Sequence, residues 1–145
     1  MNETAVTHYI TETFADVETS TAYDYTFFFY RSERKLPFAT LATVDNEYDR
    51  VSHLDRPGVF RLNIGVSRPT FESLFGTAKP DLSSYDFTAL DTVMPHPDYA
   101  PQSWVCVLSP SDATFQQIVQ PLLAEAYDLA VKRFDRAQSR HEAEA

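Results

Sequence analysis

Cysteine and glycine are scarce in this sequence, and their scarcity excludes several classes of site. The single cysteine, Cys106, rules out an internal disulfide and any zinc cluster built from cysteines. It lies in the apolar run SWVCVL, which is typical of a small buried side chain rather than a reactive thiol. Three glycines in 145 residues are too few for a glycine-rich loop that cradles phosphate groups.

Long hydrophobic runs are missing as well. No stretch approaches the roughly 20 apolar residues that a membrane-spanning helix needs. The first residues, MNETAVTHYITETF, lack the basic region and the apolar segment of a secretory signal. We therefore expect a soluble, cytoplasmic protein with no membrane partner. No motif calls for a cofactor.

Positive charge is sparse and dispersed. The chain carries 12 lysines and arginines against 21 aspartates and glutamates, which gives a formal net charge of −9 at pH 7. The densest basic group is RSERK at residues 31–35. Because contacts to phosphate supply most of the affinity of nucleic-acid binders, we expect neither DNA nor RNA as a ligand.

Aromatic residues, in contrast, are abundant, with 11 phenylalanines and 8 tyrosines in a chain long enough to bury a core. The hydrophobic pattern predicts an α+β fold, a single compact domain in which an N-terminal helix, a short middle helix and a long C-terminal helix pack on an antiparallel sheet. We expect this domain to span residues 1–137 and to leave a charged, frayed tail at 138–145. The expected strands are 23–30, 38–44, 59–66 and 103–108, and the expected helices are 2–16, 68–76 and 109–136.

Some boundaries are predicted from individual residues. The strands 23–30 and 38–44 are separated by a polar turn at 31–35 and should form an antiparallel hairpin. Ser109 and Pro110 suit the N-cap and the first position of the C-terminal helix, which Pro121 should kink or divide. Residues 85–93 fit a strand or a helical turn equally well.

Three motifs of this chain resemble those of a known group. They are VFRLNI at 59–64 followed by the helix up to Gly76, SWVCV at 103–107 after a histidine/proline loop, and LLAEAY at 122–127, where Ala126 replaces a usual serine. Together they resemble the MmcQ/YjbR-like group of α+β domains, which is related to the double-wing fold. The longer stretches PFATLATVDNEYDRVSHLDRPGVFRLNIGV and MPHPDYAPQSWVCVLSPS are similar to bacterial domain-of-unknown-function (DUF) family 6194. These resemblances imply a fold but no activity.

The stretch 52–76 is the most suggestive of a site. Arg61 and Asn63 alternate with apolar neighbours along a predicted strand and should project from the same face. An arginine on a central strand is costly to bury unless it is paired, and we expect Asp55, Asp86 or Asp91 as its partner. The alternative for Arg61 is contact with an anionic ligand.

We therefore predict a non-enzymatic domain that binds a small aromatic or anionic molecule in a cleft on the sheet. The expected ligand-binding residues are Arg61, Asn63, His96, Trp104 and Asp55.

Two other functions remain open. In the first, the protein is an enzyme in which His96 exchanges protons with an aspartate of the loop 45–55, with or without a metal; the candidates are His96, Asp49 and His53. No helical spacing of metal ligands supports a metal site, and no serine lies in a nucleophile elbow. In the second, the aromatic segment 23–30 is a protein interface, so that the chain is a homodimer rather than a monomer.

Overall fold

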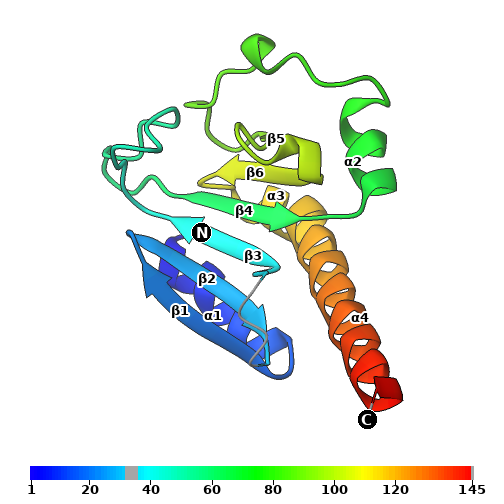
Figure 1. The fold of residues 1–145 in the computed structure, drawn as a ribbon. Helices are drawn as coiled ribbons and strands as arrows, with labels where there is room; N and C mark the ends of the chain where they lie inside the picture. The colour runs from blue at the N-terminus through cyan, green and yellow to red at the C-terminus, as the bar shows by residue number, and fades with distance from the viewer. Residues whose placement is uncertain (32–35, 145) are drawn as a thin grey trace.

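The computed structural model, which describes residues 1–31 and 36–144, confirms the predicted α+β fold. An antiparallel sheet of six strands forms its centre within those residues, in the order β1-β2-β3-β4-β6-β5 (Figure 1). The strands are β1 (Val17–Ala22), β2 (Tyr25–Tyr30), β3 (Ala39–Ala42), β4 (Arg61–Gly65), β5 (Val93–Pro95) and β6 (Trp104–Leu108).

The predicted hairpin is confirmed, since β2 pairs antiparallel with β3 and places Phe28 opposite Ala39. Of its predicted turn, residues 32–35 lie outside the described residues. A second hairpin, between β1 and β2, was not predicted. Tyr23 and Asp24 form its two-residue turn with φ angles of 54° and 66°, so the strand expected to begin at residue 23 begins only after this turn.

The two shorter helices follow their capping residues. Helix α1 (Glu3–Thr13) begins after Asn2, whose side chain accepts a hydrogen bond of 2.8 Å from the N–H of Ala5. Helix α2 (Arg68–Phe75) begins after Ser67 and ends at Gly76, which adopts a φ of 90° that favours glycine. Both helices agree with the prediction.

The C-terminal helix begins later than predicted. Its N-cap is Ser111, whose hydroxyl accepts from the N–H of Thr114, whereas the Ser109 hydroxyl accepts from the N–H of Phe60. Helix α3 (Asp112–Thr114) leads into a π-helical turn (Phe115–Val119) and then into α4 (Gln120–Glu144). The π turn ends at Val119, two residues before Pro121, which has no N–H to donate, so the expected interruption takes this form. Helix α4 runs past residue 136, where we expected it to end.

Residues 85–92 belong to no helix or strand apart from a single bridge between Leu90 and Leu108. Neither the strand nor the helical turn considered for 85–93 is therefore correct for most of that segment. Two short 3-10 turns lie nearby, at Leu82–Ser84 and Ala100–Gln102. Within the described chain, no helix combines the length and apolar character needed to cross a membrane.

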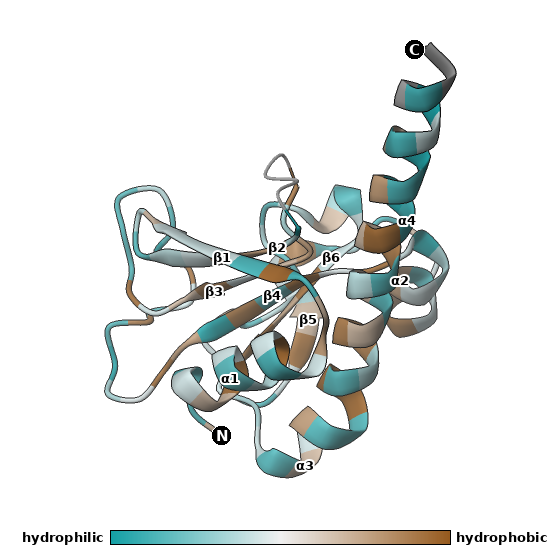
Figure 2. Ribbon diagram, turned by 90° about the horizontal axis from the view of Figure 1, so that it is seen from below, coloured by the Kyte–Doolittle hydropathy of each residue, from teal (hydrophilic) through white to brown (hydrophobic). Residues whose placement is uncertain are grey.

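The sheet has two different faces. Helices α1 and α4 lie on the same side of it (Figure 2), where Leu62 and Ile64 of β4 join the main hydrophobic core. Arg61, Asn63 and Gly65 alternate with them and therefore face the opposite side. Loops rather than helices cover that side, and only a smaller apolar cluster forms there: Ala42, Leu54, Met94, Cys106 and Leu108.

Candidate functional site

A cavity of about 790 Å³ lies on the sheet face that the loops cover. Alternate residues of β2, β3 and β4 form its floor, and the 46–49 turn and residues 96–104 form its walls. It continues past the ends of the strands to Leu129 of α4. Its lining is mostly apolar, and the Phe, Tyr and Trp side chains in it are Tyr23, Tyr25, Phe27, Phe38, Tyr48, Tyr99 and Trp104.

Arg61 projects from the same face of β4 as Asn63 and is fully buried, at 0% exposure. Its Nη1 and Nη2 donate to the two carboxylate oxygens of Asp49, at 3.1 and 2.5 Å. Nη1 also donates to the hydroxyl of Ser52 at 3.0 Å, and Nε donates to Oδ1 of Asn63 at 2.9 Å. The buried charge is thus paired and hydrogen-bonded, which offsets its loss of hydration.

Asp49 reaches Arg61 because the loop between β3 and β4 folds back over the sheet. Asn46 and Asp49 exchange two backbone hydrogen bonds, and the Asn46 side chain accepts a third from the N–H of Tyr48. Tyr25 donates its hydroxyl to the same carboxylate. Burial raises the pKa of Asp49, but the hydrogen bonds from Arg61 and Tyr25 outweigh it and the pKa is lowered. Burial and the nearby carboxylate raise the pKa of Tyr25 to about 12.

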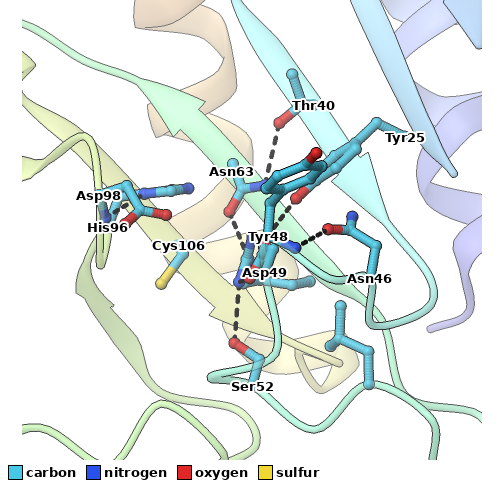
Figure 3. A network of polar contacts seen from close by, with 12 residues as sticks. Tyr25, Thr40, Asn46, Tyr48, Asp49, Ser52, Asn63, His96, Asp98 and Cys106 are labelled. Atoms are coloured by element: carbon cyan, nitrogen blue, oxygen red, sulfur yellow. Dashed lines mark hydrogen bonds and ion pairs between the residues drawn. The ribbon is translucent and has the colours of Figure 1, made fainter. Parts of the chain in front are cut away.

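Asn63 extends this network to the neighbouring strand (Figure 3). Since its Oδ1 accepts from Arg61, its Nδ2 faces Thr40, the register partner on β3, and donates to the Thr40 hydroxyl at 3.0 Å. The second N–H of the Asn63 amide has no hydrogen-bond partner among the described residues. Both Asn63 and Thr40 line the cavity.

His96 follows β5 and is buried, with 3% of its surface exposed. Its Nδ1 accepts hydrogen bonds of 3.0 Å from the backbone N–H groups of Asp98 and Tyr99. Nδ1 therefore carries no proton, and the proton of the neutral ring sits on Nε2. Burial and the positive charge of Arg61 lower the pKa of His96 to about 3, so the ring is neutral at physiological pH.

Trp104 forms a wall of the cavity by lying directly against Gly65. A methyl group added at Gly65 would come within 2.8 Å of Trp104 Cε2, closer than any ordinary contact. The two residues are register partners on β4 and β6. Gly65 is thus required for the room that it leaves to the indole ring.

A comparison with protein families places this chain. The model of a family described as "Family of unknown function (DUF6194)" matches residues 1–139. The chain belongs to this family. No curated protein and no solved structure matches the chain. The matched range includes every residue that lines the cavity.

Three of the predicted ligand-binding residues, Asn63, His96 and Trp104, line the same cavity in this DUF6194 domain. Arg61 does not line it, because the polar groups around its guanidinium separate it from the open space. The predicted ion pair of Arg61 exists, but its predicted partner is wrong: the partner is Asp49.

Asp55, Asp86 and Asp91, the expected partners of Arg61, instead accept hydrogen bonds from the backbone N–H groups of Asp45, Thr88 and Ser111. Asp55 is exposed and is not among the residues that line the cavity. His53, a catalytic candidate, is also exposed and lies outside it.

Most of the other lining residues were not predicted as site residues, and they include Tyr25, Thr40, Tyr48 and Tyr99. Tyr25 and Phe27 share a face of β2, and this alternation was a usable signal. Thr40 could be found only from the register between β3 and β4, which no local pattern gives.

Groups of three or more His, Cys, Asp or Glu side chains that could hold a metal ion do not occur in the described part of the chain. Cys106 is fully buried and is not among the residues that line the cavity. Burial raises the pKa of its thiol to about 12, so the thiolate that nucleophilic chemistry needs is absent at neutral pH.

Proposed function

We propose that this domain binds a small, uncharged and largely aromatic molecule in the cavity beside His96, and that it does so without catalysis. The observation that supports this most is a cavity of about 790 Å³ with a mostly apolar, aromatic lining and a few polar groups. Sites for small molecules commonly have volumes of about 300 to 1,000 Å³ and the same kind of lining.

The charges around the cavity favour an uncharged ligand over an anionic one. Asp49, Asp98 and Arg133 are the charged residues among the described lining, so no single sign predominates. Arg61 is neutralised by Asp49, and His96 is neutral. Arg61, the cation that was expected to bind an anionic ligand, is therefore not available for that role.

Acid–base catalysis by His96 and Asp49 has less support. Two backbone N–H groups occupy Nδ1 of His96, so this nitrogen cannot accept a proton from a substrate. The carboxylate of Asp49 is held by Arg61 and Tyr25, and no hydrogen bond joins it to His96 in the part of the chain that is described. A general base needs a free acceptor within reach of its proton.

A homodimer through the aromatic segment 23–30 also has less support than the binding of a small molecule. Phe28 packs into the main core, and Tyr25 and Phe27 line the cavity, so these side chains have roles within one chain. The relation to the MmcQ/YjbR-like group stays a proposal that rests on the motifs at 59–76, 103–107 and 122–127.

Trp104 provides the test, because it is the single tryptophan of the chain and lies in the cavity wall. Neutral aromatic compounds should quench its fluorescence in a saturable manner and raise the melting temperature. Tyr99→Ala removes part of the wall at a position that is 56% exposed, and it should weaken binding. Leu74→Ala, at a site that is 40% exposed and outside the cavity, is the matched control and should leave binding unchanged. The proposal fails if no compound binds saturably, or if Tyr99→Ala and Leu74→Ala behave alike.

A further inference from the structure

His96 presents a hydrogen-bond donor to the cavity that no group of the described chain accepts. Its Nδ1 is occupied, whereas its Nε2 makes no hydrogen bond to any described residue. No side-chain nitrogen or oxygen atom that is fully buried lacks a partner within residues 1–31 and 36–144. Nε2 must therefore remain open to the cavity, which His96 lines.

The orientation of the imidazole ring is fixed. A flip of the ring would point Nε2–H at the backbone N–H groups of Asp98 and Tyr99. All three groups are donors, so no hydrogen bond could form between them. The Tyr99 ring also packs against the imidazole, with 4.9 Å between the ring centroids. Nε2 thus keeps its proton and acts as a donor only.

A second donor is available near it. The Asn63 amide gives one N–H to Thr40 and keeps the other unpartnered among the described residues. Figure 3 shows the His96 ring pointing toward the Asn63 side chain, and both residues line the cavity. A purely hydrocarbon ligand would displace the water that can accept from these donors and leave both without a partner, which is unfavourable.

We infer that the ligand carries an uncharged acceptor oxygen on its aromatic framework, such as a ketone, ester or amide carbonyl, and that this oxygen accepts the Nε2–H of His96. This inference rests on the proposed function and adds to it the chemical class of the ligand. A carboxylate fits less well because the guanidinium of Arg61, the cation expected to hold it, is already paired with Asp49.

The charged and titratable groups near His96 come from several elements. Asp49 lies on the loop between β3 and β4, Arg61 on β4, Cys106 on β6, and Asp98 and Tyr99 on the segment that follows His96. Asp49 and Arg61 form one ion pair, and the Cys106 thiol is protonated at neutral pH. With the ring of His96 neutral as well, binding of a neutral carbonyl compound should not change between about pH 6.5 and pH 8.

Three naphthalene probes of nearly equal size test the inference: 2-acetylnaphthalene, which has the carbonyl, 2-ethylnaphthalene, which lacks it, and 2-naphthoate, which is charged. Quenching of Trp104 fluorescence measures each affinity. The ketone should bind roughly tenfold more tightly than the hydrocarbon, the effect of one buried hydrogen bond, and more tightly than the carboxylate.

The variant His96→Asn isolates the donor. Its side-chain oxygen takes the place of Nδ1 and can still accept from the N–H groups of Asp98 and Tyr99, but it has nothing in place of Nε2–H. His96→Asn shortens a lining side chain and should weaken both ligands somewhat, but it should weaken the ketone more and so remove the preference for the ketone over the hydrocarbon.

The possible outcomes separate the inference from the proposed function. Equal affinities of the wild-type protein for the ketone and the hydrocarbon would overturn the inference while binding itself stands, and this comparison needs no variant. Tightest binding of 2-naphthoate would overturn the uncharged class. If none of the three probes quenches Trp104, the proposed aromatic-binding function fails together with the inference.

Discussion

Acidification to about pH 5 should destabilise this domain by about 2 kcal/mol through His96 alone. The pKa of His96 is about 3 in the folded protein, against 6.5 for an ordinary histidine. Between these two pKa values, His96 is protonated in the unfolded chain but not in the folded protein. Each pH unit below 6.5 therefore lowers the free energy of unfolding by about 1.4 kcal/mol. The stabilising effect is complete above pH 6.5 and is lost progressively as the pH falls toward 3.

The geometry explains why the folded protein lowers the pKa of His96. A protonated ring would place an Nδ1–H against the N–H groups of Asp98 and Tyr99, which now donate to Nδ1 at 3.0 Å. It would also bring a second positive charge into the buried surroundings of Arg61. Both effects oppose protonation in the folded state only.

Urea unfolding followed by circular dichroism measures the effect. Between about pH 7.5 and pH 5, the midpoint should fall by roughly 1 M with little change in slope, for a slope of about 2 kcal/mol per M. His96→Asn is the control, because asparagine keeps the acceptor for the two N–H groups but does not titrate. Its midpoint should hardly move over the same range.

The pH window separates His96 from the carboxylates. The lowered pKa of Asp49 means that its contribution to stability is present above about pH 4 and is lost only below that. Parallel losses in the wild-type protein and in His96→Asn between pH 7.5 and pH 5 would therefore refute the argument.

Three further predictions follow from the same contacts. Asp49→Asn leaves the buried charge of Arg61 without its counter-ion and should lower the free energy of unfolding, measured in urea, by about 3–5 kcal/mol. Asp49→Leu combined with Arg61→Met removes both charges and should recover most of that loss. Equal losses in the two variants would contradict the pairing of Arg61 with Asp49. Gly65→Ala should cost about 1–3 kcal/mol and shift the Trp104 emission spectrum, because the added methyl group collides with the indole; an unchanged spectrum would show that the ring is not held there. Cys106 should react with a thiol reagent only after unfolding in urea, and rapid labelling of the native protein would contradict its burial and its raised pKa.

The parts of the fold that were predicted correctly depend on local chemistry. Ser67 caps α2 and Gly76 ends it, and both roles belong to the residue type itself. Strand β1 was missed because Val17–Ala22, with the sequence VETSTA, is a mostly polar edge strand without a buried face. Its turn also lacks the glycine that usually marks such a hairpin. Tyr23 and Asp24 instead take positive φ angles that residues other than glycine rarely adopt.

The partner of Arg61 could not be predicted for a different reason. Asp55, Asp86 and Asp91 each accept from a backbone N–H group, a role that any aspartate in a turn can take. Asp49 looks no different in the sequence. Only the turn at 46–49, which folds back over the sheet, selects it, and that turn depends on contacts between distant parts of the chain.

The ion pair between Arg61 and Asp49 affects how the side chains that line the cavity are oriented. A buried ion pair seldom stabilises a fold more than well-packed apolar side chains of the same volume would. What apolar side chains could not do is fix the direction of several groups at once. Arg61 holds Asp49, Asp49 holds the hydroxyl of Tyr25, and Arg61 also orients the amide of Asn63. Because Tyr25, Asp49 and Asn63 all line the cavity, the buried pair fixes the direction of three lining side chains, and this would reduce the ordering cost of binding the proposed ligand.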